Sequence, residues 1–242
     1  MFDHFVYIEP CARRGQDRAE VVEHRDGLIV ILADGAGGTS GGAEAADTVM
    51  LWARAFADRT DDIRSASKWA ELLAKVDQQL QLNNGQTTAV IVALCDDGIV
   101  GASVGDSAAW IIKPGGGYID LTSAQVHKPL IGAGGAQPVP FEHAQLEGAL
   151  LVASDGLVKY APPAQICSAA SDPDLSSAAK KMANLTRLKS GALWDDVAVV
   201  LCRQRRPTSV SSHAGRKRYS LGEDGELVED SDKEPDSSDV TG

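Results

Sequence analysis

Short runs of apolar residues predict the strands of this chain. Five such runs occur, at 28–34, 87–97, 98–106, 149–155 and 196–202. They are rich in valine, isoleucine, leucine and alanine and are bounded by glycine, aspartate or serine, which is typical of short buried strands. The Asp97-Gly98 pair between two of the runs predicts a type I′ hairpin, so at least part of the sheet is expected to be antiparallel.

Apolar residues at helical spacing predict three helices, over 43–58, 67–82 and 174–188. Two of them lie between the first strand and the hairpin, and the third precedes the last strand. Strands grouped in hairpins, with helices between the groups, predict an α+β layered domain in which sheet packs on sheet and the helices lie outside.

The composition changes near the C-terminus. The chain has 242 residues and is 43% hydrophobic, which is enough for a substantial core. From 207 onward serine, glycine and charged residues dominate, with nine acidic residues against four basic ones. We therefore predict a folded domain at 1–206 and a disordered acidic tail at 207–242.

Charge and cysteine content narrow the class of function. A net charge of −11 disfavours binding to nucleic acid and favours a metal ion or a positively charged partner. The four cysteines contain no CxxC pair, so the sequence indicates neither a zinc site nor a disulfide framework. No stretch approaches the roughly 18 apolar residues that span a membrane, and no basic leader precedes an apolar run. We expect a soluble cytoplasmic protein without a membrane partner.

Aspartates stand at the ends of the predicted strands. A single strand-end aspartate is usually a turn former that bonds its own backbone, but five of them in one domain suggest a shared role. Clustered carboxylates without histidine or cysteine favour Mg²⁺ or Mn²⁺ and can hold two ions about 3.5 to 4 Å apart. The five residues are Asp34, Asp106, Asp155, Asp195 and Asp196.

The short motifs around these aspartates resemble a known family when they are taken in order. They are DGAGG at 34–38, GQTTA at 85–89, GDS at 105–107, SDG at 154–156 and WDDVAV at 194–199. This series resembles the successive motifs of the PPM, or type 2C, protein phosphatases, and most closely their compact bacterial members. The resemblance implies an αββα sandwich of two mostly antiparallel sheets flanked by helices, with a metal cleft at one end.

The resemblance also implies roles for individual residues. Asp34 is similar to the ligand that bridges both metals, and the carbonyl of Gly35 completes one site. Asp155 and Asp195 are similar to the ligands of the other principal metal. Asp106 resembles the residue that, together with Asp155, holds a looser third metal in bacterial members.

The N-terminal motif departs from the family pattern. The family usually places an arginine, which grips substrate phosphate, a few residues before an acidic triplet. Here RRGQDR at 13–18 offers Arg13 or Arg14 with shorter spacing. We expect Arg13 to bind phosphate, and Asp17 to act as an outer or water-mediated metal ligand.

Two further positions differ. Ala36 stands where many eukaryotic members have a histidine proposed as general acid, so that leaving-group protonation would fall to a metal-bound water or be slow. Asp196 stands where the family often has asparagine, and we expect it to support the site without binding metal. The Gly- and Pro-rich segment 113–148 predicts one short β-turn and a mobile loop, in the region that holds the family's flap over the cleft.

The leading hypothesis is a metal-dependent phosphatase that uses two Mn²⁺ or Mg²⁺ ions, with room for a third, to hydrolyse phosphoserine and phosphothreonine. Its partner would be a phosphorylated protein, a kinase or a kinase target. The alternative is a catalytically weak or silent module of the same fold that binds a phosphorylated signalling partner. A nuclease with two metals is disfavoured by the acidic surface.

Overall fold

The computed structural model describes residues 1–36, 41–81, 85–205, 219–221 and 227–229. They fall into two units, residues 1–205 and residues 206–242. In the second unit β11 (Tyr219–Leu221) and β12 (Leu227–Glu229) form an antiparallel pair. The rest of the predicted tail lies outside the described residues, so its disorder stays a prediction.

The first five-stranded sheet of residues 1–205 carries the first, second and third predicted strands. Its order is β2 (Asp17–His24), β3 (Gly27–Asp34), β4 (Ala89–Cys95), β5 (Gly98–Val104) and β8 (Val139–His143), and every neighbouring pair is antiparallel. All residues of β4 are buried, and so are residues 28–33 of β3. These strands read as continuous apolar runs because both of their faces are covered.

The second five-stranded sheet carries the remaining predicted strands. Its order is β1 (Phe2–Glu9), β10 (Val197–Gln204), β9 (Ala149–Ala153), β6 (Ala108–Ile112) and β7 (Tyr118–Asp120), again antiparallel throughout. The two sheets pack face to face, and their shared core includes Val30 and Val92 from one sheet and Val152 and Val200 from the other.

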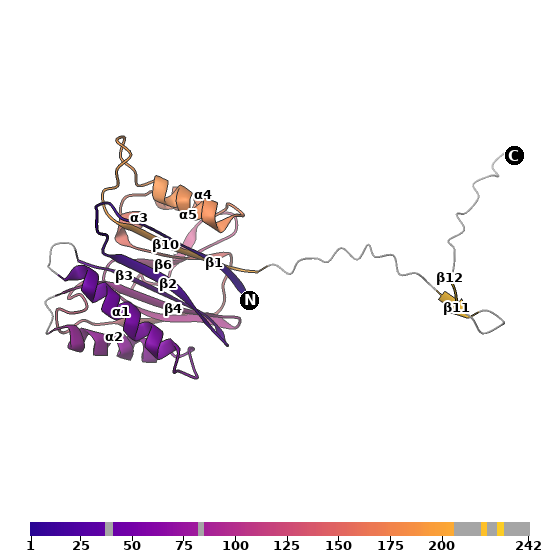
Figure 1. The fold of residues 1–242 in the computed structure, drawn as a ribbon, viewed down its shortest axis with the longest axis horizontal. Helices are drawn as coiled ribbons and strands as arrows, with labels where there is room; N and C mark the ends of the chain where they lie inside the picture. The colour runs from indigo at the N-terminus through magenta and orange to yellow at the C-terminus, as the bar shows by residue number, and fades with distance from the viewer. Residues whose placement is uncertain (37–40, 82–84, 206–218, 222–226, 230–242) are drawn as a thin grey trace. The chain divides into compact units, whose positions relative to one another are not determined.

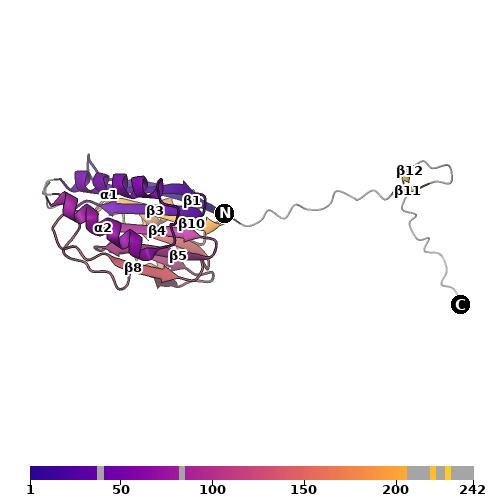
Figure 2. The ribbon, with the colours of Figure 1, turned by 90° about the horizontal axis from the view of Figure 1, so that it is seen from below.

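Helices cover both outer faces of the sandwich (Figure 1). The long helices α1 (Gly42–Ala57) and α2 (Ala66–Leu80) pack on the first sheet (Figure 2). Trp69 of α2 is fully buried there. On the second sheet lie α3 (Asp155–Val158), α4 (Pro163–Ala169) and α5 (Leu175–Asn184). The predicted αββα sandwich is therefore confirmed. None of the described helices is long and apolar enough to cross a bilayer, and the four cysteines are unpaired thiols.

The hairpin between β4 and β5 is present, but its turn differs from the prediction by one residue. Cys95 pairs with Gly98, so Asp96 and Asp97 form the turn and Gly98 begins β5. This register keeps Ile99 fully buried between the sheets, and a shift by one residue would turn that side chain outward.

Segment 113–148 contains more structure than the predicted β-turn and mobile loop. It includes β7 and β8, and its central loop is fixed by a buried carboxylate of α2. Asp77 accepts hydrogen bonds from the amides of Gly132, Gly134 and Ala136 at 2.7, 3.1 and 3.0 Å. The sequence did not predict these contacts, because they are made from 55 to 59 residues away, and the mobility of the loop stays a prediction.

Candidate metal centre

Six aspartates gather at one end of the sandwich, where β3, β5 and β9 end and β2 and β10 begin. Asp17 and Asp34 face each other in the β2–β3 pairing, and the other four flank β5, β9 and β10. Their carboxylates influence one another electrostatically across the two sheets. The set comprises Asp17, Asp34, Asp106, Asp155, Asp195 and Asp196.

The backbone of Asp34 is fixed by two threonines of the 85–89 motif. Its carbonyl oxygen accepts hydrogen bonds from the Thr87 hydroxyl at 2.9 Å and the Thr88 amide at 2.8 Å. Its amide donates to the Thr88 hydroxyl at 3.1 Å, and that hydroxyl pairs with Ser107 at 2.8 Å. These supporting side chains had no assigned role in the sequence analysis, although their presence in the motifs was the signal that could have found them.

Two glycines let separate segments approach closely at this end. A side-chain carbon on Gly35 would lie 2.5 Å from the carbonyl of Gly42, where α1 begins. One on Gly156 would lie 1.8 Å from the carbonyl oxygen of Asp196. Only glycine fits at these two contacts. Residues 37 and 38 of the DGAGG motif lie outside the described residues.

Asp17 is a buried acid whose carboxylate is not fully hydrogen-bonded by the described residues. It is 3% exposed, and its Oδ2 atom has no hydrogen-bond partner among the described residues. Burial raises the pKa of Asp17 to about 7, the charges of Asp196 and Asp155 add to the rise, and the Ser154 hydroxyl opposes it. The same causes raise the pKa of Asp34, chiefly burial and then the charges of Asp17 and Asp155.

Asp155 connects the second sheet to this cluster. It begins α3, and its pKa is raised by burial and then by the charges of Asp106 and Asp195. Its Oδ2 lies 3.8 Å from the ammonium of Lys159, which is the one ion pair that any of the six aspartates makes within the described part of the chain. One exposed lysine cannot balance so many carboxylates.

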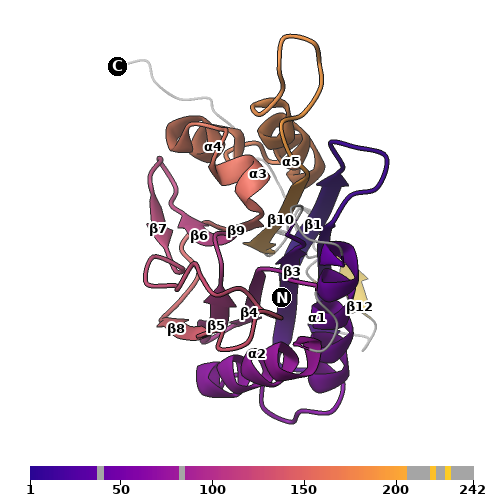
Figure 3. The same ribbon diagram turned by 90° about the vertical axis from the view of Figure 1, so that its left-hand side faces the viewer.

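The carboxylate of Asp196 holds a loop through hydrogen bonds to the backbone. It is 7% exposed and accepts hydrogen bonds from the amides of Cys11 and Gln16 at 2.7 and 2.5 Å. The loop between β1 and β2 that it holds carries Arg13 and Arg14 (Figure 3). Both arginines are exposed and form no hydrogen bond or ion pair with the described residues. The structure thus brings their loop to the cluster but leaves their side chains unengaged.

The chemistry of this cluster fits a divalent cation. Buried carboxylates that raise one another's pKa, together with an unpartnered Asp17 oxygen, are stabilised by a hard cation with oxygen ligands. Among the described residues, no three acidic, histidine or cysteine groups lie close enough to enclose one ion. Mg²⁺ and Mn²⁺ do not need such a triad, since these ions keep several waters and bind through one or two carboxylates.

Ala36 brings no proton-transfer group to this end. Its amide donates to the Gln86 carbonyl at 2.9 Å, so this part of the backbone is fixed while the methyl side chain stays chemically inert.

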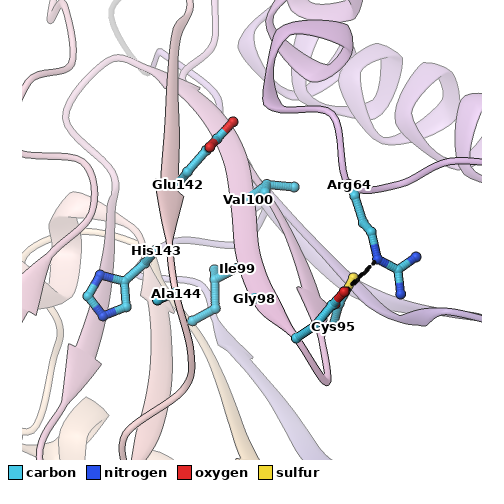
Figure 4. A pocket seen from close by; sticks show the side chains of 9 residues that line it. Arg64, Cys95, Gly98, Ile99, Val100, Glu142, His143 and Ala144 are labelled. Carbon is cyan, nitrogen blue, oxygen red and sulfur yellow. Dashed lines mark hydrogen bonds and ion pairs between the residues drawn. The ribbon is translucent and has the colours of Figure 1, made fainter.

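A cavity of about 350 Å³ lies at the opposite end of the first sheet, where β4 ends and β5 begins (Figure 4). Arg64, Cys95, Glu142 and His143 are among its lining residues. Arg64 is already engaged by Asp26 and Asp97, at 3.4 and 3.3 Å. None of the six clustered aspartates lines this cavity. Because Arg64 is already paired with two carboxylates, its charge is not available to a ligand there.

Known proteins resemble this chain in sequence motif and in fold. Residues 12–129 match the family described as "Protein phosphatase 2C". No curated protein sequence matches the chain.

Several solved structures have the same fold. The S. agalactiae serine/threonine phosphatase is 24% identical, with a TM-score of 0.73 over 85% of this chain and 100% of that one. The phosphatase Stp1 from Staphylococcus aureus is 17% identical, with a TM-score of 0.74 over 85% and 96% of the two chains. The catalytic domain of the phosphatase PstP, solved with two manganese ions, is 17% identical, with a TM-score of 0.68 over 83% and 97%. At these identities the likeness shows the fold.

Proposed function

We propose that this chain, whose residues 12–129 match the protein phosphatase 2C family, is a metal-dependent phosphoprotein phosphatase acting on phosphoserine and phosphothreonine. The observation that carries the proposal is the convergence of carboxylates from both sheets, with a single lysine as their ion-pair partner in the described structure. Such a cluster is costly to retain unless cations occupy it.

We assign the metal ligands from the cluster. Asp34 and the carbonyl of Gly35 would hold one Mn²⁺ or Mg²⁺ ion, and Asp155 and Asp195 would hold a second. Asp106 lies within electrostatic reach of Asp155 and suits a third, weaker site. When bound, the ions activate water as a nucleophile and neutralise charge on the phosphoryl group.

Asp17 and the hydroxyl-bearing residues position this set. The free Oδ2 of Asp17 is available to a water that ligates metal, while Thr87 and Thr88 hold Asp34 at the end of its strand. Ser154 accepts a hydrogen bond from the Ala198 amide at 2.9 Å and so ties β9 to β10 beneath the cluster. Rigid supports of this kind keep ligands in place before the cation arrives.

Arg13 grips the substrate phosphate, with Arg14 as its neighbour on the same loop. Guanidinium groups bind phosphate through two parallel hydrogen bonds, and neither arginine is engaged by a described carboxylate. In a chain with a net charge of −11, this loop is a local source of positive charge next to the metal centre. The substrate is a phosphorylated protein, a kinase or a kinase target, and the enzyme works in the cytoplasm without nucleic acid or membrane.

Hydrolysis of para-nitrophenyl phosphate and of a phosphothreonine peptide tests the proposal. We expect turnover with Mn²⁺ or Mg²⁺, none with EDTA, and a loss of more than about 100-fold in Asp155→Asn, since removing even a supporting partner of a metal ligand costs roughly 10- to 100-fold. Asp97→Asn, an exposed carboxylate at the other end, is the matched control. Mn²⁺ binding without turnover of either substrate would contradict the enzyme assignment and leave a silent binding module.

A further inference from the structure

Two aromatic rings stack beside the metal centre. Tyr160 follows α3, which Asp155 begins, and Trp194 directly precedes Asp195. The ring centroids are 6.1 Å apart and the planes differ by 9°. α3 packs against β10. The stack therefore joins the two segments that carry the second pair of proposed metal ligands. The position of the two rings relative to the proposed metal centre is therefore set by the same segments that carry Asp155 and Asp195.

The indole of Trp194 is not used for packing the core. It is 62% exposed, whereas the preceding Leu193 is 9% exposed and anchors this segment in the core under α3 and α5. Trp69 and Trp110, in contrast, are 0% and 5% exposed. Stacked on Tyr160, this exposed indole offers a flat apolar surface beside the proposed reactive centre, and exposed aromatic rings of this kind are enriched at binding interfaces.

Lys159 closes one side of the pair. Its ammonium lies 5.4 Å from the centroid of the Tyr160 ring and 3.8 Å from the Asp155 carboxylate. A second cation brought onto the same rings would be repelled by this ammonium. The pair is thus better suited to a neutral ring than to an arginine or lysine.

We propose that Tyr160 and Trp194 form a subsite that binds an aromatic or proline ring of the substrate, within about two residues of the phosphorylated position. The subsite rests on the proposed phosphatase function and specifies its substrate class. The Lys159 ammonium lies 5.4 Å from the Tyr160 ring and 3.8 Å from Asp155, so one side chain spans the gap between the stack and the cluster. Neighbouring residues of an extended peptide are about 3.3 to 3.6 Å apart, so one or two residues cover a gap of this order. Flat rings gain from stacking beyond the burial of their area.

Three phosphothreonine peptides test this subsite. They differ at one position near the phosphothreonine, which is phenylalanine, glycine or arginine. The ratio of kcat/KM for the phenylalanine peptide over the glycine peptide is expected to be about 2- to 13-fold in the wild type, which matches a stacking gain of about 0.5 to 1.5 kcal/mol. In Trp194→Ala the ratio falls to near one, and in Trp194→Phe, which keeps a ring, most of it returns. Leu51→Ala, which removes another exposed apolar side chain on α1, keeps the wild-type ratio.

Three outcomes would overturn the subsite: a wild type without preference, a preference that survives in Trp194→Ala, or a preference for the arginine peptide. Binding of the same peptides, followed by fluorescence anisotropy with Mn²⁺ present, separates this question from catalysis. If no peptide is hydrolysed but the phenylalanine peptide binds more tightly to the wild type than to Trp194→Ala, the phosphatase function fails and the subsite stands. If peptides are hydrolysed without any such difference, the function stands and the subsite fails.

Discussion

The carboxylate of Asp196 accepts a hydrogen bond of 2.7 Å from the backbone amide of Cys11, which is 185 residues away in the sequence. With its second bond to the Gln16 amide, Asp196 fixes both ends of the loop that carries Arg13 and Arg14. The residue just before the last core strand therefore positions the loop that brings Arg13 and Arg14 to the carboxylate cluster.

Asp196→Ala is expected to loosen this loop. Two amides lose their acceptor, so we predict that KM for a phosphothreonine peptide rises about tenfold, equivalent to about 1.4 kcal/mol, while kcat falls less. The effect of Arg13→Ala should shrink in the Asp196→Ala background, because both changes disturb the same contact with phosphate. Steady-state kinetics of the four proteins measures this coupling.

The control for this cycle is Asp61→Ala, whose side chain is 89% exposed in its pair with Arg25. It should leave KM within about twofold of the wild type. If Asp196→Ala leaves KM unchanged and weakens only the affinity for Mn²⁺, then Asp196 acts through its neighbour Asp195 and not through the loop.

The stability of the metal-free protein should fall as pH rises from about 4 to 7. The pKa of Asp17 is raised to about 7 in the folded protein, and that of Asp34 is raised as well. Between the unfolded and folded pKa values, the folded state binds protons that the unfolded state does not, so stability is lost with rising pH. Mn²⁺ needs the ionised carboxylates, so its stabilising effect should grow over the same range.

Thermal unfolding at several pH values, with EDTA or Mn²⁺, measures this dependence. At a fixed concentration of 100 times its Kd at neutral pH, Mn²⁺ should add about 2.7 kcal/mol to the free energy of unfolding at that pH. The same concentration should add much less near pH 5, where Mn²⁺ binds more weakly. Asp17→Asn should flatten the curve in EDTA, because the group that titrates is removed. If the metal-free protein became more stable between pH 5 and 7, the raised pKa values of Asp17 and Asp34 would be contradicted.

Asp77→Ala is expected to destabilise the loop at 132–136. Three amides lose a carboxylate acceptor that is itself 3% exposed, and we predict a loss on the order of 3 kcal/mol in the free energy of unfolding. Gln78→Ala, at an exposed position of the same helix, should change it by less than about 0.5 kcal/mol. Urea denaturation of both variants checks the difference, and equal effects would show that the three amides find other partners.

The sequence predicted the fold where burial is uniform. β3, β4 and β10 lie between a helix layer and the other sheet, so their residues are apolar almost without interruption. β1 and β2 were not predicted because they are edge strands with charged residues, such as Asp3 and Glu23 at exposed positions and Glu20 at a partly buried one. Single-turn α3 is too short for helical periodicity to appear.

The candidate site was predictable to the extent that its residues stand at strand ends. Antiparallel pairing places Asp17 opposite Asp34, and the motif order marked the others. The supporting contacts depend on tertiary structure, as in the link from Asp196 to Cys11 or from Asp77 to Gly132. Local pattern carries no information on such distant partners, and so their roles emerged only from the folded chain.

Isothermal titration of Mn²⁺ into the metal-free protein decides whether the aspartate cluster is a metal centre, independently of any substrate. We predict that the wild type binds at least two ions per chain with release of protons, and that Asp34→Asn loses at least one of them. Asp97→Asn should bind like the wild type. A wild type that binds no Mn²⁺, or an Asp34→Asn variant that binds as the wild type does, would contradict the assignment of these carboxylates.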